Sequence, residues 1–368
     1  MFERRLYYHI DWALLAAVLV LCALGVAMIF STTADPTRGA SHLYITQLYA
    51  IVIGLGAMVV MLTIDYRAFA DKSHLIYIAL LAALVYVLFL GSTQMGARRW
   101  IAIGSFNLQP SEFAKLALIL TLAHYYSKAQ RVGWLQRVVL PGLLVLPGLL
   151  LILKQPDLGS GLSFLAVYAA MLLMVGMRSK ALGVILLFSL MLFPFAWEMM
   201  WGSLHDYQRQ RIMTFVDPVY DPGGKGYHAL QSRIAIGAGE LTGKGLYGGT
   251  QSQLKFLPEG HTDFVFSVFA EEWGFLGVLV LLLLFVGLIW LSLEIVARAK
   301  DQLGALLAVG ILCMLSFCVV INIGMTAGMF PIVGIPLPLM SYGGSATVMT
   351  MASLGLLLNV KRRRLSFF

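Results

Sequence analysis

The chain has 368 residues, of which 60% are hydrophobic and only 12% are charged, and its formal net charge is +8. A soluble domain cannot bury that much apolar surface, so the composition excludes a soluble globular protein and predicts a polytopic membrane protein. The positive charge does not indicate a nucleic-acid partner, because most cationic residues lie at the ends of apolar runs, where they set membrane orientation.

About ten apolar runs are long enough to cross a membrane as helices. They lie at roughly 11–31, 46–65, 74–92, 111–127, 139–154, 160–177, 181–200, 264–297, 303–328 and 345–360. We therefore predict an all-α membrane protein: one integral membrane domain over residues 1–368, built as a bundle of about ten transmembrane helices. A loop at about 201–262 contains no spanning segment and is longer than an ordinary connection, which points to a functional role.

Lysine and arginine predict the orientation of the bundle. If the N-terminus lies inside, every inner end of a span is basic, as the positive-inside rule requires. These inner-end residues are Arg4, Arg5, Arg67, Lys72, Lys128, Arg131, Arg137, Arg178, Lys180, Arg298, Lys300 and Lys361 to Arg364. Both termini are therefore predicted to be cytoplasmic, with the long loop outside.

Several cations lie on the side that this rule disfavours. Arg98 and Arg99, in the motif GARRW, follow the third span, and Lys115 lies several residues into the fourth. One use for such cations is to bind an anion at the membrane surface, for example a lipid-linked diphosphate. The alternative is that the arginines reach lipid headgroups and that Lys115 pairs with Glu112, three residues before it.

Asp157, in KQPDLGSG, is an acidic residue on the predicted outer side. It could cap the sixth span, pair with Lys154 or belong to a site. In the long loop, Arg209 and Arg211 of QRQRI suit a polar ligand, although a solvated loop surface also explains them.

The stretch GMFPIVGIPLPLMSYGGSA covers residues 328–346, and its three prolines interrupt any helix. Irregular backbone at membrane depth is tolerated where it is buried in protein or lines a wet cavity. We therefore expect a cavity wall here, followed by the last helix starting at Ser341 to Ser345. The backbone N–H groups of that start could bind an anion.

Asp263, in LPEGHTDFVFSVFAEEWG, lies where a polar loop enters an apolar run. A carboxylate at this boundary could have a raised pKa and act as a general base. The alternative is that Thr262 or Asp263 merely caps the helix. Further along the same run, Glu271 or Glu272 could pair with a cation such as Lys115.

These motifs resemble those of the SEDS family of shape, elongation, division and sporulation proteins. GARRW, QPSEFAKL, KQPDLGSG, LPEGHTDFVFSVFAEEWGFLG and GMFPIVGIPLPLMSYGGSA occur in family order from about residue 90 onward. The short N-terminal tail and overall length are more similar to the elongation branch of the family than to its division branch.

The resemblance implies a peptidoglycan glycosyltransferase that polymerises lipid II at the outer face of the cytoplasmic, or inner, membrane. The family's catalytic aspartate falls on Asp263, which would act as the general base. Arg98, Arg99, Lys115 and Asp157 match positions proposed to line the family's substrate cavity, and Arg209 and Arg211 match a basic loop motif. Neighbouring cations, or a divalent cation such as Mg²⁺ or Mn²⁺, would stabilise the undecaprenyl diphosphate leaving group.

The implied partners are a class B penicillin-binding protein, which is a transpeptidase, and elongation-complex proteins such as MreC and MreD. Two other classes of function remain open from the residues alone: a transporter or flippase for lipid-linked precursors, and a non-catalytic membrane scaffold. A transporter needs polar groups through the whole membrane thickness, whereas the inner halves of these spans are almost purely apolar. A scaffold does not explain why acids and cations gather on one side.

Overall fold

The computed structural model describes residues 11–33, 42–94, 97–103, 106–129, 133–176, 213, 225–254, 256–257 and 259–363. Its helices are α1 (Trp12–Thr33), α2 (Leu43–Thr63), α3 (Tyr66–Asp71), α4 (Ser73–Leu90), α5 (Pro110–Lys128), α6 (Trp134–Lys154), α7 (Leu158–Met174), α10 (Lys225–Ala238), α11 (Thr250–Gln253), α12 (Val265–Ala297), α13 (Gln302–Thr326) and α14 (Gly344–Arg363).

The all-α membrane fold is confirmed. Within the described residues, each predicted span coincides with a helix to within a few residues, and six helices are long and apolar enough to cross a membrane. The predicted span at 181–200 lies outside the described residues. The short helices α3, α10 and α11 and a small sheet between α4 and α5 were not predicted.

That sheet has three antiparallel strands, β1 (Ser92–Gln94), β2 (Ala97–Ile103) and β3 (Phe106–Leu108), in the order β1-β2-β3. Its register pairs Thr93 with Arg98 and Ala102 with Asn107. The strands are too short for alternation to predict them from sequence, because a few apolar residues beside a long apolar span resemble its continuation.

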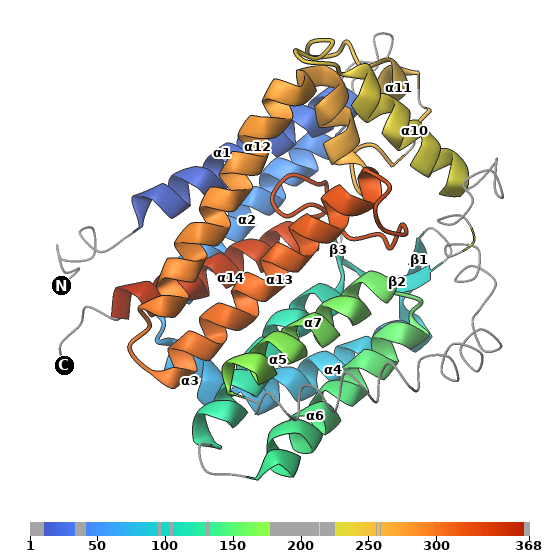
Figure 1. The fold of residues 1–368 in the computed structure, drawn as a ribbon. Helices are drawn as coiled ribbons and strands as arrows, with labels where there is room; N and C mark the ends of the chain where they lie inside the picture. The colour runs from blue at the N-terminus through green and yellow to red at the C-terminus, as the bar shows by residue number, and fades with distance from the viewer. Residues whose placement is uncertain are drawn as a thin grey trace.

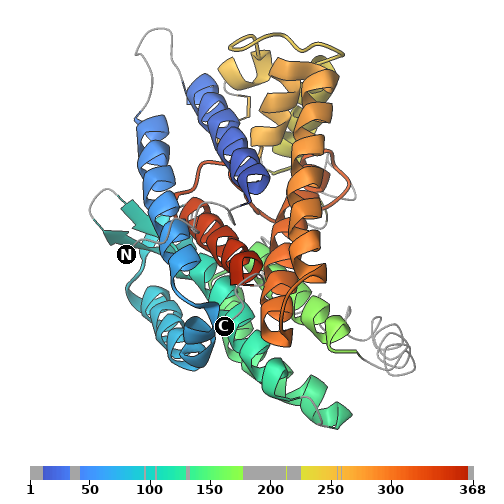
Figure 2. The same ribbon diagram turned by 90° about the vertical axis from the view of Figure 1, so that its left-hand side faces the viewer.

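The centre of the bundle is α14, whose residues from Thr347 to Val360 are all buried. It packs along α2 and contacts α13, α12 and α5, and Figure 2 shows it between α2 and α12. Small residues allow this close packing: a Cβ at Gly355 would lie 2.4 Å from the carbonyl oxygen of Met58 on α2. Peripheral helices such as α4 instead expose large side chains, including Phe89 and Leu90, as a helix facing lipid does.

The two ends of the bundle differ (Figure 1). At one end, called here the loop end, lie α10, α11 and the strands β1 to β3. At the other, called here the basic end, lie α3, the start of α1 and the end of α14. Ion pairs join distant segments at the basic end: Lys361 with Asp11, Arg363 with Asp65, and Arg67 with Asp301.

Candidate active site

Asp263 lies at the loop end, in the turn that leads into α12. The helix starts at Val265 and its N-cap is Phe264, so neither Thr262 nor Asp263 occupies the capping position that their residue types suggest. The Thr262 hydroxyl donates instead to Glu259 Oε2 at 2.8 Å. Asp263 is half-buried, so its carboxylate lies at the border between the packed bundle and its surroundings.

The carboxylate of Asp263 lies beside the irregular segment 327–343. A Cβ at Gly334 would be 3.4 Å from Asp263 Oδ2, and Gly334 has a φ of +75°, a conformation that favours glycine. The segment is attached to the turn by the hydroxyl of Ser341, which donates to the Thr262 carbonyl at 2.6 Å. The predicted broken backbone therefore forms a wall beside Asp263.

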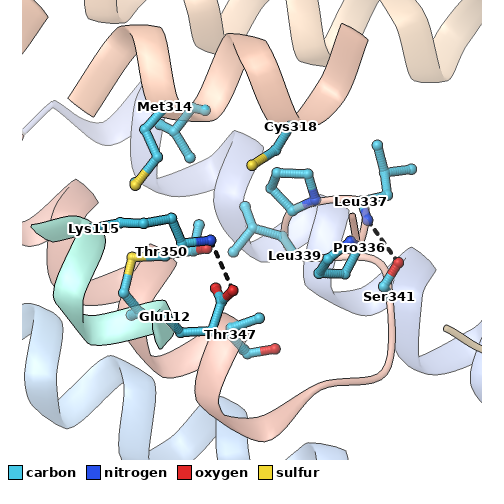
Figure 3. A pocket seen from close by; sticks show the side chains of 14 residues that line it. Glu112, Lys115, Met314, Cys318, Pro336, Leu337, Leu339, Ser341, Thr347 and Thr350 are labelled. Atoms are coloured by element: carbon cyan, nitrogen blue, oxygen red, sulfur yellow. Dashed lines mark hydrogen bonds and ion pairs between the residues drawn. The ribbon is translucent and has the colours of Figure 1, made fainter. Parts of the chain in front are cut away.

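Behind this wall is a small pocket that contains a buried ion pair (Figure 3). Lys115 Nζ lies 2.7 Å from Glu112 Oε1, and both side chains are almost fully buried. The cavity volume is about 20 Å³, enough for one water molecule. Ser341 also lines this pocket, so the pocket and the Asp263 turn share a side chain. The pairing of Lys115 with Glu112, one of the two sequence interpretations, is what the structure contains.

Asp157 is the N-cap of α7, because its Oδ1 accepts a hydrogen bond from Ser160 N at 3.1 Å. Its Oδ2 accepts from Ser111 and from Gln109, each at 3.3 Å, at the start of α5. The capping prediction is confirmed. The cation paired with Asp157 in the described part of the chain is Arg99, at 3.9 Å, and the suggested pair with Lys154 is not formed.

The two neighbouring arginines of β2 lie in different surroundings. Arg99 is partly buried, and its guanidinium donates to the carbonyls of Gln155 and Pro156, between α6 and α7. Arg98 is exposed. Arg209 and Arg211 lie outside the described residues.

The suggested pairing of Glu271 or Glu272 with Lys115 is wrong. Glu271 is fully buried on α12 and pairs with Lys244 at 2.7 Å, whereas Glu272 accepts a hydrogen bond from Ser31 on α1. The physical reason is the long loop before α12: its residues 240–245 fold back over the start of that helix and bring Lys244 to the buried carboxylate. Sequence spacing alone cannot show such a return.

Among the described residues, no group of three or more His, Cys, Asp or Glu side chains is close enough to hold a metal ion. A titratable neighbour does lie in the turn: burial lowers the pKa of His261, while the charge of Glu259 opposes that shift. His261 is therefore neutral near pH 7.

Comparison with known proteins decides the family. The sequence model of the FtsW/RodA/SpoVE family, described as cell cycle proteins, matches residues 12–365. The chain is 39% identical over 356 residues to the peptidoglycan glycosyltransferase MrdB of Escherichia coli K12, covering 97% of this chain and 94% of that protein. The chain belongs to the FtsW/RodA/SpoVE family.

Other members of the FtsW/RodA/SpoVE family match over similar lengths. The peptidoglycan glycosyltransferase RodA of Treponema pallidum is 32% identical, covering 96% of this chain and 98% of that protein. Stage V sporulation protein E of Bacillus subtilis is 36% identical, covering 96% and 97%. The family resemblance seen in the sequence motifs is thereby confirmed.

Solved structures of the FtsW/RodA/SpoVE family share the fold. One, described as the structural coordination of polymerization and crosslinking by a peptidoglycan synthase complex, has a TM-score of 0.82 and 34% identity, covering 97% of this chain and 99% of that one. The crystal structure of the rod shape determining protein RodA of Thermus thermophilus has a TM-score of 0.72 and 31% identity, covering 97% and 98%.

Two polar residues at the loop end of the bundle were not predicted from the sequence. Gln47 of α2 donates to Thr347 and accepts from Gly343 N, so it holds the start of α14. Asn322 of α13 donates to the carbonyl of Asp263. Both are polar residues inside long apolar runs, and that placement is the signal that could have identified them.

Proposed function

We propose that this chain is a peptidoglycan glycosyltransferase that polymerises lipid II, with Asp263 as its general base. The names of its relatives support the reaction, since proteins called peptidoglycan glycosyltransferases match it over nearly their whole length. The observation that carries the role of Asp263 is its position: a half-buried carboxylate at the loop end, against the glycine-containing wall of the irregular segment.

The chemistry requires one proton acceptor. Asp263 takes the proton from the acceptor sugar hydroxyl while that oxygen forms a bond to the anomeric carbon of the donor. The bond from that carbon to the diphosphate oxygen breaks, and undecaprenyl diphosphate leaves with the electron pair. A base that is held in place contributes about 10²- to 10⁴-fold to such a step.

The leaving diphosphate requires positive charge nearby. Arg98 is exposed on β2 at the loop end, which leaves it accessible to an anion, whereas Arg99 already holds two carbonyls. Lys115 is almost fully buried and pairs with Glu112 at 2.7 Å, so an anion would have to enter the pocket to reach its remaining N–H donors. Asp157 acts indirectly in this proposal, because its carboxylate pairs with Arg99 and accepts hydrogen bonds from the start of α5. Arg209 and Arg211 of the outer loop are further candidates for binding the diphosphate. A divalent cation such as Mg²⁺ or Mn²⁺ could arrive bound to the diphosphate, and no step here depends on it.

The proposed setting is the bacterial cytoplasmic membrane, with both termini inside and a role in cell elongation. The basic end carries Arg67, Arg363 and Lys361 together, which supports a cytoplasmic location for it. The similar solved structure belongs to a peptidoglycan synthase complex whose description names both polymerization and crosslinking. This description supports a class B penicillin-binding protein, a crosslinking enzyme, as the partner. MreC and MreD are further partners of this proposal.

Replacing Asp263 tests the general base. In Asp263→Ala and Asp263→Asn, purified with the transpeptidase partner and supplied with lipid II, polymerisation should fall by about 10²- to 10⁴-fold. Thermal unfolding in detergent checks that both variants fold. Glu240→Gln is the matched control, because it removes an exposed carboxylate of the outer loop without touching the turn. Glycan polymer formed at the native rate by folded Asp263→Ala would show that this assignment is wrong.

A further inference from the structure

Asn322 is a polar side chain at a place where the bundle is otherwise apolar. It lies near the end of α13, between Ile321 and Ile323, and is fully buried. A buried amide costs free energy unless its hydrogen-bonding groups are satisfied, and polar residues inside membrane spans are commonly functional.

The amide of Asn322 joins two chain segments that are distant in sequence. Its Nδ2 donates to the Asp263 carbonyl at 3.0 Å and to the Ile335 carbonyl at 2.7 Å, so both of its N–H groups are used. Its Oδ1 accepts no hydrogen bond from the described residues. The opposite orientation of the amide would place Oδ1 against two carbonyl oxygens, so the contacts themselves determine which way the group points.

Three successive carbonyls of the turn are held in the same way. The carbonyl of His261 accepts from Tyr342 N at 2.8 Å, and that of Thr262 accepts from Ser341 Oγ at 2.6 Å. The carbonyl of Asp263 is the third, held by Asn322. The first two donors belong to the segment before α14, while Asn322 comes from the packed helix α13 and so ties the turn to the rigid bundle.

The contact through Asn322 also sets what lies beside the carboxylate. Ile335, its second acceptor, follows Gly334, and Gly334 is the residue whose Cβ position lies 3.4 Å from Asp263 Oδ2. One buried amide therefore fixes both the backbone that carries the carboxylate and the wall that the carboxylate faces. Loss of the amide frees the two segments to move relative to each other.

We propose that Asn322 is a positioning residue for glycosyl transfer, which holds Asp263 at its place against the irregular segment. The proposal rests on the role of Asp263 as the general base. Asn322 does not touch the substrate; it acts through the backbone of Asp263. A displacement of about 1 Å at a reacting group can reduce a rate by about 10²-fold.

The experiment compares two buried asparagines in the full-length protein with its transpeptidase partner. Asn322→Leu removes the amide and keeps a side chain of similar size. Asn359→Leu is the matched control: Asn359 is also fully buried, on α14, and donates to the carbonyls of Met61, Leu62 and Ile64 at the basic end. Turnover of lipid II is measured per folded molecule, with the folded fraction taken from thermal unfolding.

We expect Asn322→Leu to lower kcat 10- to 100-fold, with KM for lipid II within twofold of the native value. Asn359→Leu should lose a similar amount of thermal stability and keep kcat within twofold. If Asn322→Leu does not fold, Asn322→Ser takes its place, because a serine hydroxyl has one proton and cannot donate to both carbonyls. A native kcat in the folded Asn322 variant, or an equal loss of kcat in Asn359→Leu, would overturn the proposal.

A double variant separates this proposal from the one on which it rests. If Asn322 acts through Asp263, adding Asn322→Leu to Asp263→Ala should change the residual activity by less than twofold, whereas an independent role would lower it 10- to 100-fold again. Full activity in Asp263→Ala would instead refute the general base itself. An inactive Asp263→Ala beside a fully active Asn322→Leu would refute only the positioning role.

Discussion

Arg98 and Arg99 are adjacent in sequence and differ in what they can do, because successive side chains of a strand point to opposite faces. On β2, Arg99 reaches the corner between α6 and α7, where it donates to the carbonyls of Gln155 and Pro156, and Arg98 stays exposed. The motif alone presents two equal candidates for binding a diphosphate. The structure separates a structural arginine from an accessible one.

The two arginines should therefore respond differently to substitution. Arg98→Ala should weaken lipid II binding severalfold and leave the melting temperature unchanged. Arg99→Ala should destabilise the protein by about 2 kcal/mol, since hydrogen bonds from a charged group are lost and two carbonyls are left without their donor. Titration with lipid II and thermal unfolding measure the two effects. Unchanged affinity and activity in both variants would remove the arginines from the diphosphate site.

At the scale of elements, the helical backbone of α12 is interrupted at Gly274, and residues of the long loop before α12 form hydrogen bonds there. Gly274 has φ +64° and ψ −168°, outside the helical region. Residues 240–245 supply the missing partners through four backbone hydrogen bonds: Phe275 N to Glu240 O, Leu276 N to Leu241 O, Lys244 N to Glu271 O and Gly245 N to Glu272 O. The ion pair between the buried Glu271 and the exposed Lys244 lies at the same junction. Residues 240–245 are therefore attached to the helix that follows Asp263.

Gly274→Ala should break this junction. A Cβ at Gly274 would lie 2.2 Å from the backbone nitrogen of Gly243, and the backbone there adopts a conformation that is essentially restricted to glycine. We expect a loss of about 1–3 kcal/mol in stability from the conformation alone, together with faster proteolysis at residues 240–245. Gly287→Ala, in the same helix with open space at its Cβ position, is the control and should be neutral or slightly stabilising. Equal stability of both variants would contradict the junction.

At the scale of the whole molecule, the basic end closes the bundle by joining segments far apart in sequence. Asp301, the N-cap of α13, accepts from Gly304 N at 2.8 Å, from Tyr66 at 2.9 Å and from Arg67 at 2.7 Å. Burial alone would raise the pKa of Asp301, but these donors outweigh it and hold the pKa below its ordinary value. The same carboxylate raises the pKa of Tyr66, already raised by burial, to about 12.

This gives a pH dependence with a definite sign. A carboxyl whose pKa is lowered by folding stabilises the protein above its unfolded pKa of about 4, and that stability is lost as pH falls through the folded pKa. Asp301→Asn keeps a good helix cap and removes the charge, so it should cost about 1 kcal/mol at neutral pH. The gap in melting temperature between the native protein and this variant should close as pH falls below about 4. A gap that persists unchanged to about pH 3 would contradict the assignment.

The sequence by itself determined the class of fold, most of the spans and the residue proposed for the chemistry. In a membrane protein, the length of each apolar run predicts the spans and the helical fold. A span needs about 20 apolar residues, and every backbone polar group must form its hydrogen bond within the helix. The sequence also marked Asp263 as a carboxylate at a boundary and predicted that the irregular stretch of residues 328–346 forms a cavity wall. The motif order then indicated the family.

Only the tertiary structure decided which groups meet. Glu271 pairs with Lys244, Arg99 with the α6–α7 corner, and Asn322 with Asp263, and in each case the partners are at least 27 residues apart. A hydropathy pattern does not show which distant segments of the chain come together. It indicates that a buried polar group needs a hydrogen-bond partner, but it does not identify that partner. The three-strand sheet was missed because its strands have only three to seven residues, too few for alternation to distinguish them from the end of the preceding apolar span.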